Sequence, residues 1–386
     1  MKKIFTKQMV VLTMVTFLYM CSISMSNPVM AGLCALVGGG GMIMGVIGGL
    51  SSFVSLFCRP FLGTLIDHYD RRQLGLIGLL GMGIGGLICT FSPNVYILFL
   101  GRLCAGIGLA ICSSTFSTWF AASLPPERMG QGMGLYGVVQ ALSMACAPAI
   151  GLWFANLINS RLTCMIAAIL NLVSILLVFP LKDYNYSSHQ SAVKDESAEK
   201  CQFFIPELIP LAILMFLFCV PYNGTTAFLE TVVSDRKLAF NAGLYFTIFA
   251  IALLITRFAL SKFLDNYPYR YFVWMCIPFG IFSMLLLQWM NGFSFMMLSA
   301  ITLTLSYGII QPVSQAACMR SVSKDQQGVA NCTYYVGMDL GMAFGPIIAG
   351  ATYQIAGESA VFYIMSLFPL LSVPILFVFR NSIKKL

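Results

Sequence analysis

The feature that most constrains this chain is a succession of apolar runs, each about twenty residues long, that recurs from one end of the sequence to the other. At 1.5 Å of rise per residue, a helix of that length crosses a hydrocarbon layer of ~30 Å. Composition agrees, since 59% of the residues are hydrophobic and 9% are charged, against roughly a quarter charged in an ordinary soluble domain. An all-α integral membrane protein is therefore predicted.

Twelve transmembrane helices are predicted from these runs. Their approximate bounds are 8–30, 42–67, 73–92, 95–122, 129–155, 162–181, 204–229, 239–265, 271–290, 293–319, 327–351 and 360–380. The longest polar stretch lies between the sixth and seventh spans. It divides the chain into an N-terminal six-helix bundle (1–181), a cytoplasmic linker (182–203) and a C-terminal six-helix bundle (204–386).

The distribution of basic residues predicts the orientation, because Lys and Arg gather on the cytoplasmic side of membrane proteins. With the N-terminus inside, the outer segments carry only Arg161, Arg236 and Lys237, and the cytoplasmic segments carry most of the others. A multi-pass protein of the cell inner membrane with both termini in the cytoplasm is predicted. The net charge of +8 reflects this topology, so no nucleic-acid partner is expected.

The two halves of the sequence carry a repeat. Its matching residues are always separated by the same number of positions, the number that separates Arg59 from Arg257. The repeated residues are scarce in spans or shape helices, and they pair as Arg59 with Arg257, Asp67 with Asp265, Tyr69 with Tyr267, Arg72 with Arg270, Gly130 with Gly328, Tyr136 with Tyr334, Leu142 with Leu340 and Pro148 with Pro346. Because an even number of helices separates the copies, the halves have parallel topology. The prediction is two pseudo-symmetric six-helix bundles.

The segment after the second span combines a glycine, an acid and two arginines. It reads Gly63-Thr64-Leu65-Ile66-Asp67-His68-Tyr69-Asp70-Arg71-Arg72. Gly63 permits the close approach of another helix, Asp67 can cap a neighbouring helix N-terminus, and the arginines hold the cytoplasmic boundary. The segment resembles the signature Gly-x-Leu-x-Asp-Arg-x-Gly-Arg-Arg of the major facilitator superfamily.

That resemblance implies the fold of this superfamily, with helices one, four, seven and ten around a central cavity. It also implies a latch that holds the halves together in the outward-facing state, formed by Gly63, Asp67, Arg71 and Arg72, with Asp265 and Arg270 in the second copy. His68 replaces an arginine of the signature and Asp70 a glycine, which predicts a weaker or pH-sensitive latch. The alternative is a basic anchor at the membrane surface only.

The fourth span resembles a second signature of the superfamily, Leu-x-x-x-Arg-x-x-Gln-Gly-x-Gly-x-Ala. The matching residues are Leu98, Arg102, Gly106, Gly108 and Ala110, with Ala105 in place of glutamine. An arginine is costly in lipid and should face the protein interior or water. In relatives it is linked to proton transfer or to contacts with anionic substrates. The alternative is a structural arginine bonded to helix carbonyls.

The fifth and eleventh spans resemble a glycine and proline pattern associated with drug–proton antiporters. The matching residues are Pro148 and Gly151 in the fifth span, and Gly341, Gly345 and Pro346 in the eleventh. Small residues at four-residue spacing permit close helix contact, and a proline bends its helix. The same pattern occurs in transporters of other substrates, so it does not define the substrate.

Asp339 is the only acid that the sequence places deep within a span, ~16 Å along the eleventh helix from Gly328. An ionisable residue at that depth is a candidate for function. Asp339, Arg59 and Arg102 are therefore the candidates for proton coupling, and the superfamily architecture suggests that Arg59 pairs with Asp339. The alternative for Asp339 is a structural carboxyl that aids helix packing.

Several polar side chains within the spans are candidates to line a substrate cavity, although each could equally be a packing contact. They are Gln140, Asn223, Gln311, Gln315, Tyr334 and Tyr335. The thirteen cysteines form no Cys-x-x-Cys pair and are predicted to pack as small apolar residues. No metal site and no cofactor are expected.

An enzyme is not expected, because the two histidines, His68 and His189, lie in loops and no Gly-x-x-x-x-Gly-Lys phosphate loop is present. The main hypothesis is a monomeric secondary active transporter that works by alternating access and exports drug-like molecules or metabolites against protons. Its partners would be a small-molecule substrate, protons and the lipid bilayer. The alternative is a proton symporter or facilitator for uptake of a sugar or other metabolite, and a channel or scaffold suits the repeat less well.

Cysteine labelling tests the topology. An impermeant maleimide should label Arg161→Cys from outside intact cells and Lys194→Cys only in inverted vesicles, each compared with the parent chain because native cysteines are present. Labelling of Lys194→Cys from the outer face alone would reverse the predicted orientation.

Overall fold

The computed structural model describes residues 7–38, 41–125, 128–181, 204–238, 240, 243–260 and 267–379. Within these ranges the chain forms helices and turns, and no strand occurs there. Nine of the described helices are long and apolar enough to cross a membrane. The predicted all-α membrane fold is thus confirmed.

Each predicted span corresponds to one helix or to two consecutive ones. In chain order the helices are α1 (Lys7–Ser26), α2 (Met30–Leu36), α3 (Gly41–His68), α4 (Arg71–Thr90), α5 (Val95–Ala122), α6 (Met129–Leu157), α7 (Ser160–Val178), α9 (Ile209–Asp235), α10 (Gly243–Leu260), α11 (Tyr269–Gln288), α12 (Phe293–Leu303), α13 (Ile309–Arg320), α14 (Gln327–Ala356), α15 (Glu358–Leu370) and α16 (Ser372–Val378). The first span continues beyond its predicted end into α2. A 3-10 turn at Asn27–Val29 separates α1 from α2, because the proline in it interrupts the α-helical hydrogen bonds. The tenth span is divided by a π-helical turn, η5 (Thr304–Gly308).

The helices form two compact units. Unit 1 comprises Met1–Pro125, Leu142–Phe204 and Ser323–Cys332, and unit 2 comprises Pro126–Ala141, Ile205–Val322 and Thr333–Leu386. The units follow the predicted halves of the sequence except at two segments. The start of α6 falls in unit 2, and the start of α14 falls in unit 1.

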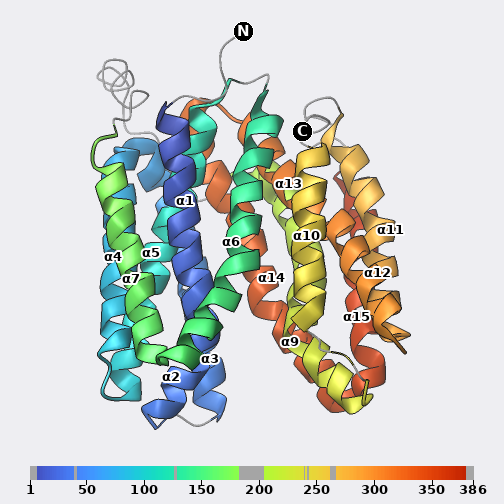
Figure 1. Cartoon of the computed structure of the whole chain (residues 1–386). Helices are drawn as coiled ribbons and strands as arrows, with labels where there is room; N and C mark the ends of the chain where they lie inside the picture. Colours follow the sequence, from blue (N-terminus) through green and yellow to red (C-terminus); the bar gives the residue numbers. More distant parts are fainter. Residues whose placement is uncertain are drawn as a thin grey trace. The chain divides into compact units, whose positions relative to one another are not determined.

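Within each unit the helices pack side by side, and many of the packed pairs are far apart in the sequence (Figure 1). In unit 1, α4 packs against α5 and α7, and α7 packs against α1. In unit 2, α11 packs against α12 and α15, and α9 packs against α15 and α13. The short connections in unit 1 are fixed by side-chain caps. Asn94 accepts a hydrogen bond from the N–H of Ile97 at 3.0 Å, and Asn159 accepts one from Leu162 at 2.8 Å.

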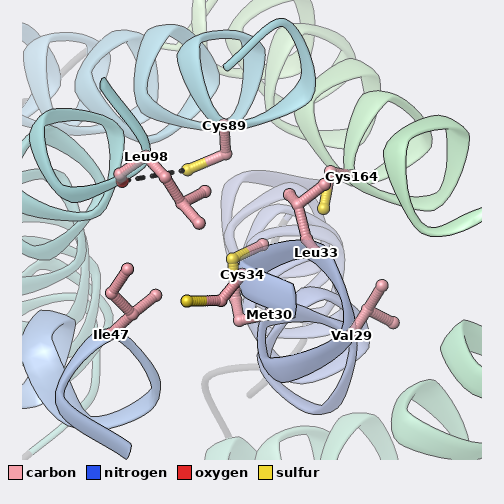
Figure 2. Packing of buried hydrophobic residues seen from close by; sticks show 8 residues of the cluster. All are labelled: Val29, Met30, Leu33, Cys34, Ile47, Cys89, Leu98 and Cys164. Carbon is pink, nitrogen blue, oxygen red and sulfur yellow. Dashed lines mark hydrogen bonds between the residues drawn. The ribbon is translucent and has the colours of Figure 1, made fainter. Parts of the chain in front are cut away.

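A buried apolar cluster joins α2, α3, α4, α5 and α7 of unit 1 (Figure 2). Its members are Val29, Met30, Leu33, Cys34, Ile47, Cys89, Leu98 and Cys164. The thiol of Cys89 donates to the carbonyl oxygen of Leu98 at 3.9 Å. The cysteines of this cluster are free thiols, and they fill the core as small apolar side chains, as the sequence predicts.

Candidate functional site

The carboxylate of Asp67, in the last turn of α3, binds the first turn of α14. Its Oδ1 accepts from the N–H of Gly328 at 2.6 Å, and its Oδ2 accepts from the N–H of Val329 at 2.9 Å. The first N–H groups of a helix have no partner within it, and the helix dipole favours negative charge there. Asp67 therefore caps α14 with charge-assisted bonds, and all three residues lie in unit 1.

Two glycines make this cap possible. A Cβ atom on Gly328 would lie 2.6 Å from the carbonyl oxygen of Gly63 and 2.7 Å from Oδ1 of Asp67. A Cβ atom on Gly63 would lie 2.8 Å from Cα of Val329. The backbones of α3 and α14 thus approach more closely than any side chain would allow at either position, as proposed for Gly63 from the sequence.

The residues that follow Asp67 organise the ends of α4 and α7. Asp70 accepts a hydrogen bond from the N–H of Arg72 at 2.9 Å and so caps α4, which explains an acid at the position where the signature has glycine. Arg72 donates to the carbonyl oxygen of Phe179 just beyond the end of α7, with its guanidinium 5.3 Å from the centre of that ring. Arg71 is buried.

The second copy of this segment is only partly described. Asp265 lies outside the described residues. Arg270 is described, and its guanidinium lies 5.1 Å from the centre of the Tyr271 ring. A gating role for either copy stays a prediction.

Two arginines predicted for proton coupling are buried in unit 1 and hydrogen-bonded there. Nη1 of Arg59 donates to the hydroxyl oxygen of Ser113 at 2.8 Å, to that of Ser114 and to the carbonyl oxygen of Ala110 at 3.2 Å. Arg59 and Asp339 fall in different units, so their pairing stays a prediction.

Arg102 has backbone and amide partners. Its Nε donates to the carbonyl oxygen of Ile47 at 3.0 Å, and its Nη2 donates to Oδ1 of Asn27 at 3.1 Å. These contacts agree with the alternative of a structural arginine, because they provide the guanidinium with hydrogen-bond acceptors inside the helix bundle.

Small residues let α14 contact α9 closely in unit 2. A Cβ atom on Gly345 would lie 2.8 Å from the carbonyl oxygen of Val220, and one on Gly341 would clash with Cβ of Cys219. Gly337, which the sequence analysis did not identify, abuts the carbonyl oxygen of Ala212 in the same way. The four-residue spacing of these glycines was the signal that predicts such a face.

The other residues of the glycine and proline pattern are placed as follows. Pro346 lies inside α14. Gly151 of α6 abuts the carbonyl oxygen of Met25 in unit 1. Pro148 falls within the bounds of α6, and its side chain is outside the described part of the chain.

Asp339 lies in α14 on the stretch between Gly337 and Gly341, and 3% of its surface is exposed. Among the described residues it is the one acid in the buried class. The carbonyl oxygen of its neighbour Met338 accepts a hydrogen bond from Sγ of Cys219 in α9 at 3.4 Å. The predicted position of Asp339, a buried carboxyl within the eleventh span, is therefore confirmed, and its role stays a prediction.

The polar residues predicted to line a cavity all belong to unit 2. Asn223 donates to the carbonyl oxygen of Cys219 at 2.9 Å, and Nε2 of Gln315 donates to the hydroxyl of Tyr335 at 3.4 Å. Gln140 is buried in α6. Gln311 and Tyr334 lie next to a residue that was not predicted for the site from the sequence.

That residue is Arg257 of α10, which is 4% exposed. Its Nη2 donates to Oε1 of Gln311 at 2.7 Å, and the hydroxyl of Tyr334 donates to the carbonyl oxygen of Gln311 at 3.2 Å. Tyr307 in the π-helical turn is also within electrostatic range of the guanidinium. The repeat was the signal that could have identified Arg257, because it matches Arg59.

A small cavity lies inside unit 1, and its polar lining comes from Ser22, Ser26, Arg102 and Asn171. It encloses about 20 Å³, which is room for one water molecule. Pockets for drug-sized ligands are roughly 300 Å³ or more. This cavity is therefore not the predicted substrate site.

Comparisons with known proteins place this arrangement in context. The family model described as "Major Facilitator Superfamily" matches residues 12–336 and, in a second match, residues 239–385. The chain is 22% identical to Multidrug resistance protein 2 of Bacillus subtilis, over 88% of this chain and 87% of that protein. It is also 22% identical to the quinolone resistance protein NorA of Staphylococcus aureus, over 92% of each. The crystal structure of the human organic anion transporter MFSD10 has a similar fold, with a TM-score of 0.82, 18% identity and coverage of 96% of this chain and 98% of that one.

Asp67→Asn tests the cap on α14. The amide keeps an oxygen acceptor but loses the charge and one of the two acceptors, and each charge-assisted bond contributes roughly 1.5–3 kcal/mol. Hydrogen exchange at the start of α14 should become faster, and the unfolding midpoint of the purified protein should fall. Asp70→Asn is the matched control, because asparagine caps a helix about as well as aspartate. Unchanged exchange in Asp67→Asn would show that the cap contributes no stability.

Proposed function

Because this chain belongs to the Major Facilitator Superfamily, we propose that it exports small molecules across the membrane by alternating access, in exchange for protons. Members of this family are transporters and not enzymes, and the chain is a multi-pass membrane protein. The names of the two bacterial relatives support the direction of transport, since one is a multidrug resistance protein and the other a quinolone resistance protein. Drug-like molecules or metabolites are the proposed substrates.

The main observation that supports the proposed proton coupling is the burial of Asp339. Asp339 lies in α14, where the neighbouring residue Met338 contacts α9, and an ionisable group inside a membrane helix is a candidate for function. An exchanger needs a group that couples proton flow to substrate movement, and Asp339 is the group proposed here.

The proposed setting follows from the same fold. We place the protein in the cell inner membrane as a single chain, with both termini in the cytoplasm. Arg59 and Arg102 are proposed to support the coupling, and the Asp67 segment is proposed to stabilise one of the conformations that alternate.

Asp339→Asn tests the proposal in proteoliposomes that contain the full chain. The substitution removes the titratable group and preserves the volume of the side chain. Fluorescent-substrate movement driven by an imposed pH gradient should be lost, whereas substrate binding and exchange without a gradient should remain. Asp235→Asn, at the exposed end of α9, is the control and should keep gradient-driven transport.

Retained accumulation against a gradient in Asp339→Asn would assign this carboxyl to packing and remove it from the coupling mechanism. The direction of coupling is measured in the parent protein. Export from a compartment as protons enter supports exchange, whereas co-accumulation of substrate with protons would replace the proposal by symport.

A further inference from the structure

Arg257 is a buried cation with unused hydrogen-bond donors. Gln311 binds its Nη2, whereas Nε and Nη1 have no hydrogen-bond partner among the described residues. Buried polar donors normally find partners, and an unpaired buried charge is strongly destabilising. Proteins keep ionisable groups of this kind inside membrane helices mainly where they serve a ligand or an ion.

The repeat provides an internal comparison. Arg59 occupies the equivalent position in the first half, and Ser113 and Ser114 correspond to Gln311 and Pro312 at the same offset. Both serine hydroxyls accept from Arg59. Pro312 offers no side-chain acceptor. The second copy of the arginine thus lacks a local acceptor that the first copy has.

Among the described residues, the side chains found around Arg257 are aromatic and polar. Tyr307 and Tyr334 lie within electrostatic range of the guanidinium, and Tyr222 stacks on Tyr307 with 4.3 Å between ring centres. Tyr307 belongs to a π-helical turn, a local distortion that often occurs at functional sites. Gly137 of α6 abuts the guanidinium, where any Cβ atom would clash with Nη1. All of these residues belong to unit 2.

We infer that Arg257 is the anion-binding residue of a substrate site in unit 2, and that the site takes organic anions in which a carboxylate or sulfonate is joined to an aromatic or apolar body. The free Nε and Nη1 donors match oxyanion acceptors, because guanidinium binds such groups with short, charge-assisted bonds. The tyrosine rings supply apolar contact area beside the charge. Arg257 is closed from solvent here, so the anion enters in another conformation. The inference thus rests on the proposed alternating access and specifies its substrate class.

Three dansyl compounds with the same fluorophore test the charge requirement. They are dansylglycine with a carboxylate, dansyltaurine with a sulfonate, and dansylglycinamide without a charge. Fluorescence titration of the full chain in nanodiscs should show tighter binding of the two anions than of the amide. Arg257→Met should weaken binding of both anions by about tenfold or more, the loss expected for one charge-assisted bond, and leave the amide within about twofold. Arg257→Lys should recover part of the anion affinity.

Stability gives a readout that a structural arginine would not reproduce. Arg257→Met removes a cation with unpaired donors, so its unfolding midpoint without ligand should equal or exceed that of the parent. Arg59→Met is the matched control, because it removes a buried arginine whose donors have partners, and its midpoint should fall. A fall in Arg257→Met as large as that in Arg59→Met, with anion affinity unchanged, would overturn the inference.

Binding and gradient-driven transport distinguish this inference from the proposed function. If the parent binds the amide as tightly as both anions, or binds neither anion, the anion site is refuted, even when the amide is transported along a pH gradient. If the anions bind through Arg257 but no probe moves when a pH gradient is imposed, the site stands and proton-coupled export is refuted.

Discussion

Hydrocarbon offers no hydrogen-bond partner to a polar group, and this constraint shapes every described part of the chain. Backbone groups are satisfied within helices, and hydroxyls bond back to their own helix, as Thr16 does to Leu12 at 2.8 Å and Thr352 to Ile348 at 2.8 Å. The buried ionisable side chains are few among the described residues, and each needs specific partners. The positions of Arg59, Arg102, Arg257 and Asp339 are therefore decided by what surrounds them, more than by the helices that carry them.

The Asp67 cap shows how the same constraint operates at a helix end. The start of α14 presents N–H groups that its own ladder does not use, and a carboxylate from α3 satisfies two of them. The contact requires glycine at both Gly63 and Gly328, because the backbones lie too close for side chains. Asn331 extends it by donating to the carbonyl oxygen of Ser114 at 3.1 Å and to Thr118 at 3.0 Å. A buried amide with several partners holds its position more specifically than apolar packing alone.

Equivalent positions of the sequence repeat differ in their chemistry. Apolar faces and glycine contacts tolerate many substitutions. The partners of a buried charge do not tolerate them equally. The first half has Ser114, whose hydroxyl accepts from Arg59, and the second half has Pro312 at that position, which offers no side-chain acceptor to Arg257. The two arginines thus occupy equivalent places in the sequence with different sets of hydrogen-bond partners.

The sequence by itself determined the membrane-spanning all-α fold, the division into repeated halves and the residue types able to act, because these depend on hydropathy, spacing and the cost of charge in lipid. It identified Asp67 as a capping residue and Asp339 as a buried acid, and both positions hold. Arg257, Gly337 and Asn331 were not assigned to a site from the sequence. The repeat and the glycine spacing gave signals for the first two, whereas the partners of Asn331 lie far along the chain. The π-helical turn and the continuation of the first span into α2 were also not foreseen from the sequence. Only the tertiary structure decided which buried arginines have partners, because hydrogen bonding depends on distances and directions that a one-dimensional pattern does not contain.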